Sequence, residues 1–266
     1  MKISNIGNFT NNSFIQLKDN NWLIKQRVAG KIAARTLLLL QDEVLNNTSK
    51  TLLELNDLAE AFIIKSGGTC TFKNYKGFPF GVCMSVNKEL VHGMPRDYRL
   101  QDGDLISFDL GVTYQDAIAD TAITCVFGKP KSEQHTNLIS ATNEALMAGI
   151  NAISIGNQLG CIGHAINKCT RKYGFAIVNN YGGHGLNWNE PHASPFVENK
   201  SEINNGIRIQ PGLTIAIEPM LVINSAATKV LNDGWTVVTN DIGCHFEHSI
   251  FVHEDHVEII TDRNGL

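Results

Sequence analysis

The chain has 266 residues, of which 43% are hydrophobic and 18% charged, which is enough to bury a full core. A formal charge of -4 disfavours a nucleic-acid binder, and no apolar run approaches the roughly 20 residues that span a membrane. The N-terminus lacks the charged-then-apolar pattern of a secretory signal, so we expect a cytoplasmic protein with no DNA or membrane partner. The six cysteines form no Cys-x-x-Cys pair, which disfavours a zinc finger or a disulfide framework.

Residues 1–20 are rich in asparagine and aperiodic, and they predict an irregular N-terminal arm. No low-complexity linker divides the rest, so we expect one domain over residues 21–266. Residues 22–44 predict a long helix, because apolar side chains recur there at helical spacing. The positions expected to face the core are Ile24, Val28, Ile32 and Leu39.

The same helix carries three basic residues spaced by four, Arg27, Lys31 and Arg35. Like charges at this spacing weaken a helix slightly. The stripe is therefore either a solvated face or a contact surface for an acidic partner. A second helix follows, since Thr51 and Glu54 have capping-box spacing and the next apolar run ends on a glycine pair.

Two aspartates eleven residues apart, Asp109 and Asp120, mark the next stretch. Residues 105–110 alternate so that a strand would turn Asp109 away from its bulky apolar face. Residues 117–127 indicate a returning strand with Asp120, and the link at 111–116 is rich in turn-forming residues. A hairpin would place both carboxylates side by side in an apolar sheet. Each is costly to desolvate, so a proton or a metal cation must compensate them.

Residues 132–149 and 157–173 predict a second pair of helices, so the order of two helices followed by strands repeats. Three more polar residues then stand at predicted strand or turn positions. His184 lies among glycines, which leave room for a close approach, whereas Glu218 ends an apolar strand and Glu247 lies inside another. Taken singly, each has an ordinary structural explanation: the histidine could be part of the core, and each acid could be paired with a basic residue. Together with the two aspartates, they indicate a metal site.

The chain resembles the methionine aminopeptidases and their pita-bread relatives from Arg27 to the C-terminal strands. The resemblance lies in the order of the candidate ligands Asp109, Asp120, His184, Glu218 and Glu247. Motifs similar to those of the type I enzymes are Tyr75-Lys76-Gly77-Phe78-Pro79, Ser85-Val86-Asn87, His92-Gly93-Met94-Pro95 and Asp233-Gly234-Trp235-Thr236-Val237. The implied fold is α+β: two pseudo-symmetric αβ halves with a curved, mainly antiparallel sheet covered by helices. Residues 21–266 would then form a single catalytic metallopeptidase domain.

Four carboxylates balance two divalent cations, so a dinuclear centre would remove the repulsion expected at the hairpin. The resemblance implies that Asp120 and Glu247 bridge the ions, that Asp109 chelates one, and that His184 and Glu218 complete the other. The ions would activate a water and polarise the scissile carbonyl, and Glu218 would also relay a proton. Such oxygen-rich ligands suit Mn, Fe or Co, with Zn as a further candidate.

Two histidines complete the implied catalytic set with Glu218. His92 resembles the family histidine that contacts the scissile amide and protonates the leaving amine. His192 aligns with a second family histidine, but it stands one residue later than the family spacing. In an alternative register Trp188 takes that place, which would weaken stabilisation of the oxyanion. His245, where the family commonly has glutamine, is either an extra ligand or a group that supports one.

The resemblance also implies hydrolytic removal of the N-terminal Met of nascent polypeptides when the second residue is small. An unbranched, polarizable Met side chain suits a pocket of sulfur and aromatic groups. The expected substrate contacts are Tyr75, Phe78, Cys83, His92, His192 and Trp235. The apolar members of this set are equally compatible with an ordinary core.

Two rival functions stay open. An Xaa-Pro aminopeptidase of the same fold would share all five ligands and differ in the pocket, although such relatives usually carry an additional N-terminal domain. A non-catalytic binding module is the second rival, and it predicts missing ligands. We further expect a monomer, with the ribosome as a candidate partner of the basic stripe Arg27, Lys31 and Arg35.

Overall fold

The computed structural model describes residues 15–266, so most of the predicted N-terminal arm lies outside the described residues. The helices are α1 (Asn20–Leu45), α2 (Leu52–Lys65), α3 (Glu133–Asn151) and α4 (Gly160–Thr170), and a 3-10 turn, η1, spans Tyr75–Gly77. The four predicted helices are therefore confirmed. Within residues 15–266, none of them has both the length and the apolar character that a bilayer crossing requires. The extent of a single domain over residues 21–266 stays a prediction.

Most of the strands are short. They are β1 (Thr69–Cys70), β2 (Cys83–Val86), β3 (Glu89–Val91), β4 (Leu105–Tyr114), β5 (Ala117–Val126), β6 (Ala176–Ile177), β7 (Gly183–Asn187), β8 (Glu190–Val197), β9 (Thr214–Ile217), β10 (Met220–Val222), β11 (Thr228–Val230), β12 (Val237–Thr239), β13 (Gly243–His245), β14 (Glu247–Val252) and β15 (Val257–Ile259). The main sheet has the order β1-β4-β5-β14-β9-β7-β8, with β2 on β4 and β15 on β14. All its pairs are antiparallel. Two small sheets, β13-β10-β6 and β11-β12-β3, complete the fold.

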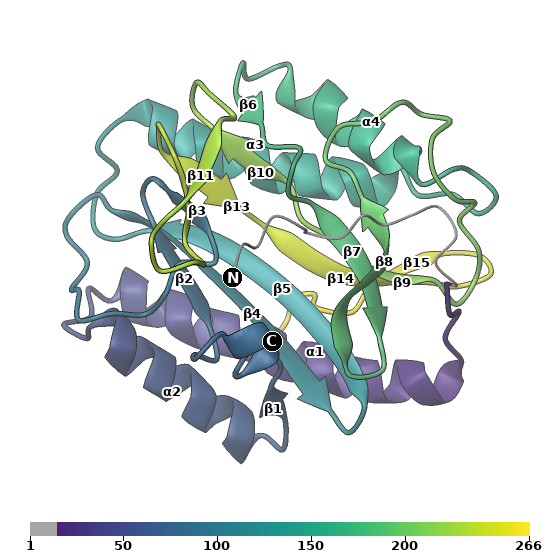
Figure 1. Cartoon of the computed structure of the whole chain (residues 1–266), viewed down its shortest axis with the longest axis horizontal. Helices are drawn as coiled ribbons and strands as arrows, with labels where there is room; N and C mark the ends of the chain where they lie inside the picture. The colour runs from purple at the N-terminus through teal and green to yellow at the C-terminus, as the bar shows by residue number, and fades with distance from the viewer. Residues whose placement is uncertain (1–14) are drawn as a thin grey trace.

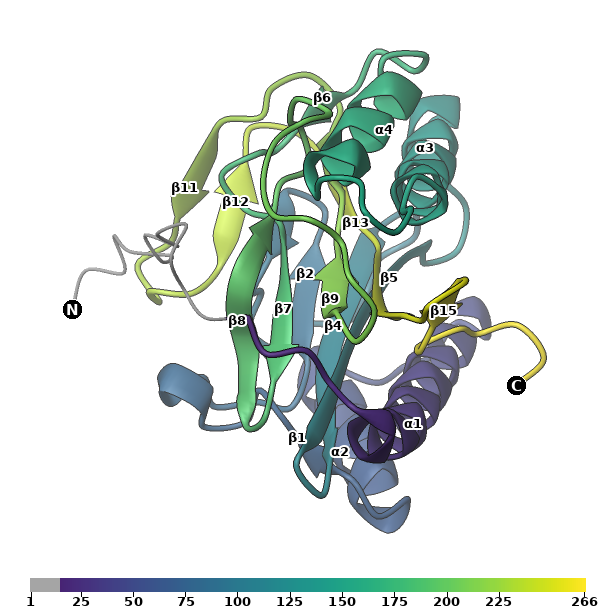
Figure 2. The ribbon, with the colours of Figure 1, turned by 90° about the vertical axis from the view of Figure 1, so that its right-hand side faces the viewer.

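The helices lie together on one side of the main sheet (Figures 1 and 2). Helix α1 packs on β4 and β5, and α3 contacts β9 and β14. Each half of the chain therefore supplies a helix pair and the strands beneath it, as the repeated order of elements predicted. Among residues 15–266, no α-helix covers the opposite face of the sheet, which holds the predicted ligands.

Helix α1 confirms the predicted segment but only part of the predicted core face, since Ile32 is buried in the core as predicted. Ile24 is 60% exposed and Val28 is 36% exposed. The helix instead contacts the core partly through small residues such as Ala29 and Gly30. A Cβ on Gly30 would lie 2.2 Å from the carbonyl oxygen of Ile260. Close approach of the backbones at Gly30 therefore helps to select the buried face, together with large side chains such as Trp22, Leu37 and Leu40.

Helix α2 begins with the predicted capping box. The Thr51 hydroxyl accepts a hydrogen bond from the Glu54 amide at 3.2 Å, and Glu54 Oε2 accepts one from the Thr51 amide at 2.7 Å. Two of the amides that a helix start leaves unpaired are thereby satisfied.

The β4–β5 hairpin is longer than the sequence suggested. Residues 111–114, predicted as part of the link, continue β4, and only Gln115 and Asp116 form the turn. Gly111 permits this, because a Cβ there would lie 2.8 Å from Thr71 Cβ. Gly111 pairs with Asp120, and Asp109 pairs with Ala122. The two aspartates thus share a face of the hairpin as diagonal neighbours rather than directly opposed ones.

Candidate metal centre

The five predicted ligands converge on the helix-free face of the main sheet. Phe108 and Leu110 pack into the core beneath α1, so Asp109 between them points the other way. The strands β4, β5, β14, β9 and β7 are consecutive in the sheet. They supply, in that order, Asp109, Asp120, Glu247, Glu218 just past its strand, and His184. Adjacent strands therefore gather residues that are up to 138 positions apart in the sequence, from 109 to 247.

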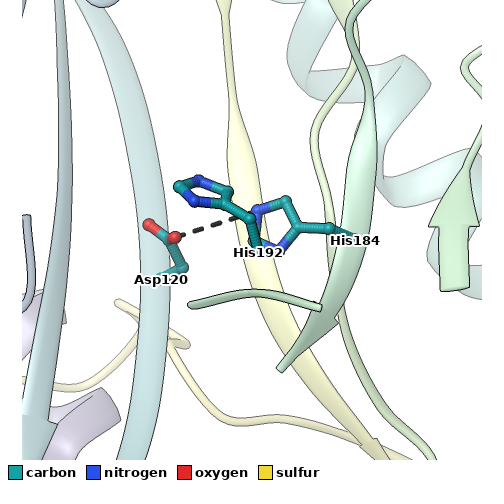
Figure 3. Close-up of side chains that lie close together, drawn as sticks. All are labelled: Asp120, His184 and His192. Carbon is teal, nitrogen blue, oxygen red and sulfur yellow. Dashed lines mark ion pairs between the residues drawn. The ribbon is translucent and has the colours of Figure 1, made fainter. Parts of the chain in front are cut away.

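The ligand atoms form three overlapping groups, and within each group they lie within 4.8 Å of one another. The groups are Asp109-Asp120-Glu247, His184-Glu218-Glu247 and Asp120-His184-His192. His184 Nε2 lies 3.4 Å from Glu218 Oε1, 3.8 Å from Asp120 Oδ2 and 3.9 Å from Glu247 Oε1. Figure 3 shows the Asp120 carboxylate facing the imidazoles of His184 and His192. Two of the groups share Glu247 and two share Asp120.

The carboxylates repel one another in a buried site. Burial, and then the neighbouring Asp120, raises the pKa of Asp109 well above its ordinary value. Burial raises the pKa of Asp120 to about 7, and it also raises those of Glu218 and Glu247. Burial lowers the pKa of His184 to about 4, so its imidazole is neutral at pH 7 and can coordinate a metal.

Four oxygens of this cluster are buried without a hydrogen-bond partner among the described residues. They are Asp109 Oδ1, both carboxylate oxygens of Asp120, and Glu247 Oε1. A buried carboxylate oxygen without a partner is unfavourable. Divalent cations that prefer oxygen and imidazole ligands would satisfy these atoms and neutralise the charge. The residues present therefore fit a metal centre.

His192 reaches the centre despite its altered spacing. Its ring lies 4.5 Å from that of His184, centroid to centroid. The β7–β8 pairing shifts register between His184 and Gly185 and again before Asn187, which takes up the irregular spacing. Trp188, the alternative candidate, is 40% exposed, and its ring packs on another tryptophan ring at 5.1 Å. The geometry thus places His192, and not Trp188, beside the ligands.

His92 approaches the centre from the segment after β3. Its φ of 58° is in the left-handed region, which is uncommon for a non-glycine residue. The ring lies 6.1 Å from that of Tyr181, a neighbour that the sequence did not single out. Burial lowers the pKa of His92 to about 4. His92 belongs to none of the three ligand groups found among the described residues, so it lies near the centre rather than in it.

His245 contacts Glu218 rather than joining the ligands. Its Nε2 lies 3.3 Å from Glu218 Oε2, while Glu218 Oε1 faces His184. The two oxygens of this carboxylate are thus divided between two imidazoles. Of the two roles left open for His245, the structure places it where it can orient a ligand.

The predicted pocket residues separate into two neighbouring places. Phe78 and Cys83 form one buried cluster, with Trp235 partly buried against it. Cys83 pairs with Asp109 across β2 and β4, so the cluster borders the metal ligands. Tyr75 instead packs on the His192 ring at 5.4 Å. Three members of the cluster were not predicted, namely Phe72, Phe80 and Met94. The crowding of aromatic and sulfur groups over residues 69–95 was the available signal.

The sequence from residue 25 to residue 254 matches the model of metallopeptidase family M24. The chain belongs to this family. It is 37% identical over 249 residues to a methionine aminopeptidase of Mycoplasma capricolum, covering 93% of this chain and 98% of that protein. It is 38% identical over 237 residues to methionine aminopeptidase 1 of Bacillus subtilis, covering 88% and 94%.

Solved structures of other proteins superpose on the fold. The methionine aminopeptidase of Rickettsia prowazekii matches with a TM-score of 0.89 at 34% identity, over 94% of this chain and 100% of that one. The prolidase of Pyrococcus furiosus matches with a TM-score of 0.74 at 20% identity, over 92% and 65%, which shows a shared fold alone. The predicted α+β pita-bread fold and the resemblance to methionine aminopeptidases are thereby confirmed. The chain is an M24 metallopeptidase, as predicted.

Proposed function

We propose that this M24 enzyme removes the N-terminal methionine from nascent polypeptides and prefers a small second residue. The observation that carries the proposal is the convergence of Asp109, Asp120, His184, Glu218 and Glu247 beside a buried cluster of aromatic and sulfur side chains. Overlap of the ligand groups at Asp120 and Glu247 supports a site for two divalent ions, which these two carboxylates would hold together with Asp109, His184 and Glu218. Co, Mn, Fe and Zn are the candidate ions.

The chain's own residues would orient the substrate and move protons. Bound divalent ions would supply Lewis-acid polarisation of the scissile carbonyl and activation of a water. Glu218, whose carboxylate lies between His184 and His245, is suited to accept a proton from the attacking water and pass it to the leaving amine. His92 and His192, both with a lowered pKa, are neutral near pH 7 and can donate an N–H to the substrate's amide or oxyanion.

The pocket suits an unbranched, polarizable side chain. Phe78 and Trp235 meet edge to face at 5.2 Å, and the Cys83 side chain is buried beside them. A Met thioether gains favourable contacts with aromatic rings. Cys83 lies opposite Asp109, so a side chain in this pocket would bring its own peptide bond close to the metal ligands. We infer that Tyr75, Phe78, Cys83, His92, His192 and Trp235 contact the substrate.

A peptide panel tests this specificity. We expect the metal-loaded enzyme to cleave Met-Ala peptides at least about 10-fold faster than Met-Lys peptides, because a difference of about 1.4 kcal/mol in how the second residue fits changes a rate tenfold. Norleucine in place of the first Met should retain much of the rate, whereas Val should not. Faster cleavage of Xaa-Pro peptides would favour the proline-directed alternative.

Metal content separates an enzyme from a binding module. Protein loaded anaerobically with Mn, Fe or Co is expected to hold close to two equivalents and to cleave Met-Ala peptides. Less than one equivalent, together with no cleavage, would favour the non-catalytic alternative.

The basic stripe on α1 is a candidate ribosome contact. Lys31 and Arg35 are exposed, whereas Arg27 is engaged by the Glu258 carboxylate through two hydrogen bonds of 2.7 Å. We expect charge reversal of Lys31 and Arg35 to Glu to lower co-sedimentation with ribosomes several-fold at low salt, with little effect near 0.5 M salt. Reversal of the exposed Lys168 on α4 is the matched control. Equal co-sedimentation of both variants and wild type would remove the stripe from the proposal. A cytoplasmic, monomeric enzyme is the setting we propose.

A further inference from the structure

Strands β5 and β14 carry Asp120 and Glu247, respectively. They pair directly at only two positions, Glu247 with Ala122 and His248 with Thr121. Side-chain hydroxyls bridge the strands next to these pairs. Ser249 Oγ accepts a hydrogen bond from the Asp120 amide and donates one to the Asp120 carbonyl, both at 2.8 Å. The Thr121 hydroxyl donates to the Glu247 carbonyl, also at 2.8 Å. The spacing of the two carboxylates therefore depends on side-chain bridges as well as on sheet hydrogen bonds.

Arg263, in the segment that follows β15, reaches the second of these bridges. Its Nη1 donates to the Thr121 hydroxyl at 2.9 Å, and its Nη2 lies 3.3 Å from His248 Nε2. With Nε2 as acceptor, His248 carries its proton on Nδ1, which lies 2.8 Å from Thr261 Oγ1. Thr121 and His248 are 0% and 6% exposed. The planar guanidinium thus holds one residue of each strand, at the position where the strands pair.

The charge of Arg263 also suits this place. The carboxylates of Asp262 and Glu247 attract its positive charge. Burial lowers the pKa of Arg263 to about 10, so the side chain remains a cation at neutral pH. A forked cation is able to satisfy two acceptors in fixed directions, which a lysine ammonium does less well.

We propose that Arg263 is a positioning residue of the metal centre, which fixes the spacing of Asp120 and Glu247 by clamping Thr121 of β5 to His248 of β14. It contacts no ligand side chain and would act through the backbones of the two strands. The proposal rests on the proposed function, because it assumes that these carboxylates hold metal.

The test compares Co²⁺ binding by wild type and by Arg263→Met, using calorimetry and the visible absorption of the bound ion. We expect roughly 10-fold or greater loss of affinity in the variant and a changed absorption spectrum, as for other groups that orient metal ligands. Turnover should fall while KM for Met-Ala peptides stays within about twofold, since the pocket is untouched. Arg263→Lys, which keeps the charge and loses the fork, should bind with intermediate affinity. Arg208→Met is the matched control, because this exposed arginine donates only to the Gly156 carbonyl.

Thr121→Val provides an independent route should Arg263→Met fail to fold. It removes the hydroxyl between Arg263 and Glu247 and is expected to weaken Co²⁺ binding in the same direction. Folded variants with wild-type Co²⁺ affinity and spectrum would overturn this proposal alone. A wild-type protein that binds less than one equivalent would overturn the proposed function and this inference together.

Discussion

Asp120→Asn is expected to lower cleavage of Met-Ala peptides about a thousandfold, the equivalent of roughly 4 kcal/mol of transition-state stabilisation. Asp120 belongs to two of the three ligand groups, so its loss affects both proposed ion positions. An amide keeps the size of the carboxylate but offers a metal one neutral oxygen and no charge. Metal content and turnover measured on the same preparation would show whether the loss of rate follows the loss of metal.

The control for this variant is Asp57→Asn, which makes the same chemical change on the exposed side of α2. It should retain wild-type activity and metal content. If Asp120→Asn retained more than about a tenth of the wild-type rate with two ions bound, Asp120 would not be a bridging ligand.

In the metal-free protein, the same substitution is expected to raise the stability of the fold at neutral pH. Burial raises the folded-state pKa of Asp120 from 3.8 to about 7. A carboxyl whose pKa is raised on folding contributes stability below the unfolded pKa, and that contribution disappears as pH rises through the folded pKa. Wild type should therefore lose up to roughly 4 kcal/mol from this group between about pH 4 and pH 8. The amide of the variant does not titrate, so metal-free Asp120→Asn should be the more stable protein above pH 7.

The measurement is the difference in free energy of unfolding between Asp120→Asn and wild type in EDTA, at several values from pH 4.5 to 8.5. Taking the difference largely cancels the pH-dependent contribution of the buried histidines, because their lowered pKa values affect the free energy of unfolding of both proteins. The difference should rise with pH and should reverse in sign when Mn²⁺ or Co²⁺ is added, because the ion stabilises wild type by binding its folded state. A difference independent of pH would mean that burial does not raise the pKa of Asp120 in the folded protein.

The helices could be predicted because they depend on local chemistry. A capping box is a contact between residues three apart, and Thr51 and Glu54 form it as predicted. The alternation around Asp109 correctly indicated which way its side chain points. By contrast, the predicted core face of α1 was wrong at Ile24 and Val28, because Gly30 is buried by a backbone approach that hydrophobic periodicity does not describe.

The sequence by itself determined which groups this protein offers to a metal: four acids and a histidine at strand and turn positions, with a family resemblance that orders them. Tertiary structure alone decided how they meet. Distant residues become neighbours only when β4, β5, β14, β9 and β7 pair side by side, and two register shifts in β7–β8 return His192 to the centre. Arg263 gains its place only because the C-terminal segment folds back against β5 and β14. Such contacts join residues far apart in the chain, and no periodic pattern or local spacing records them.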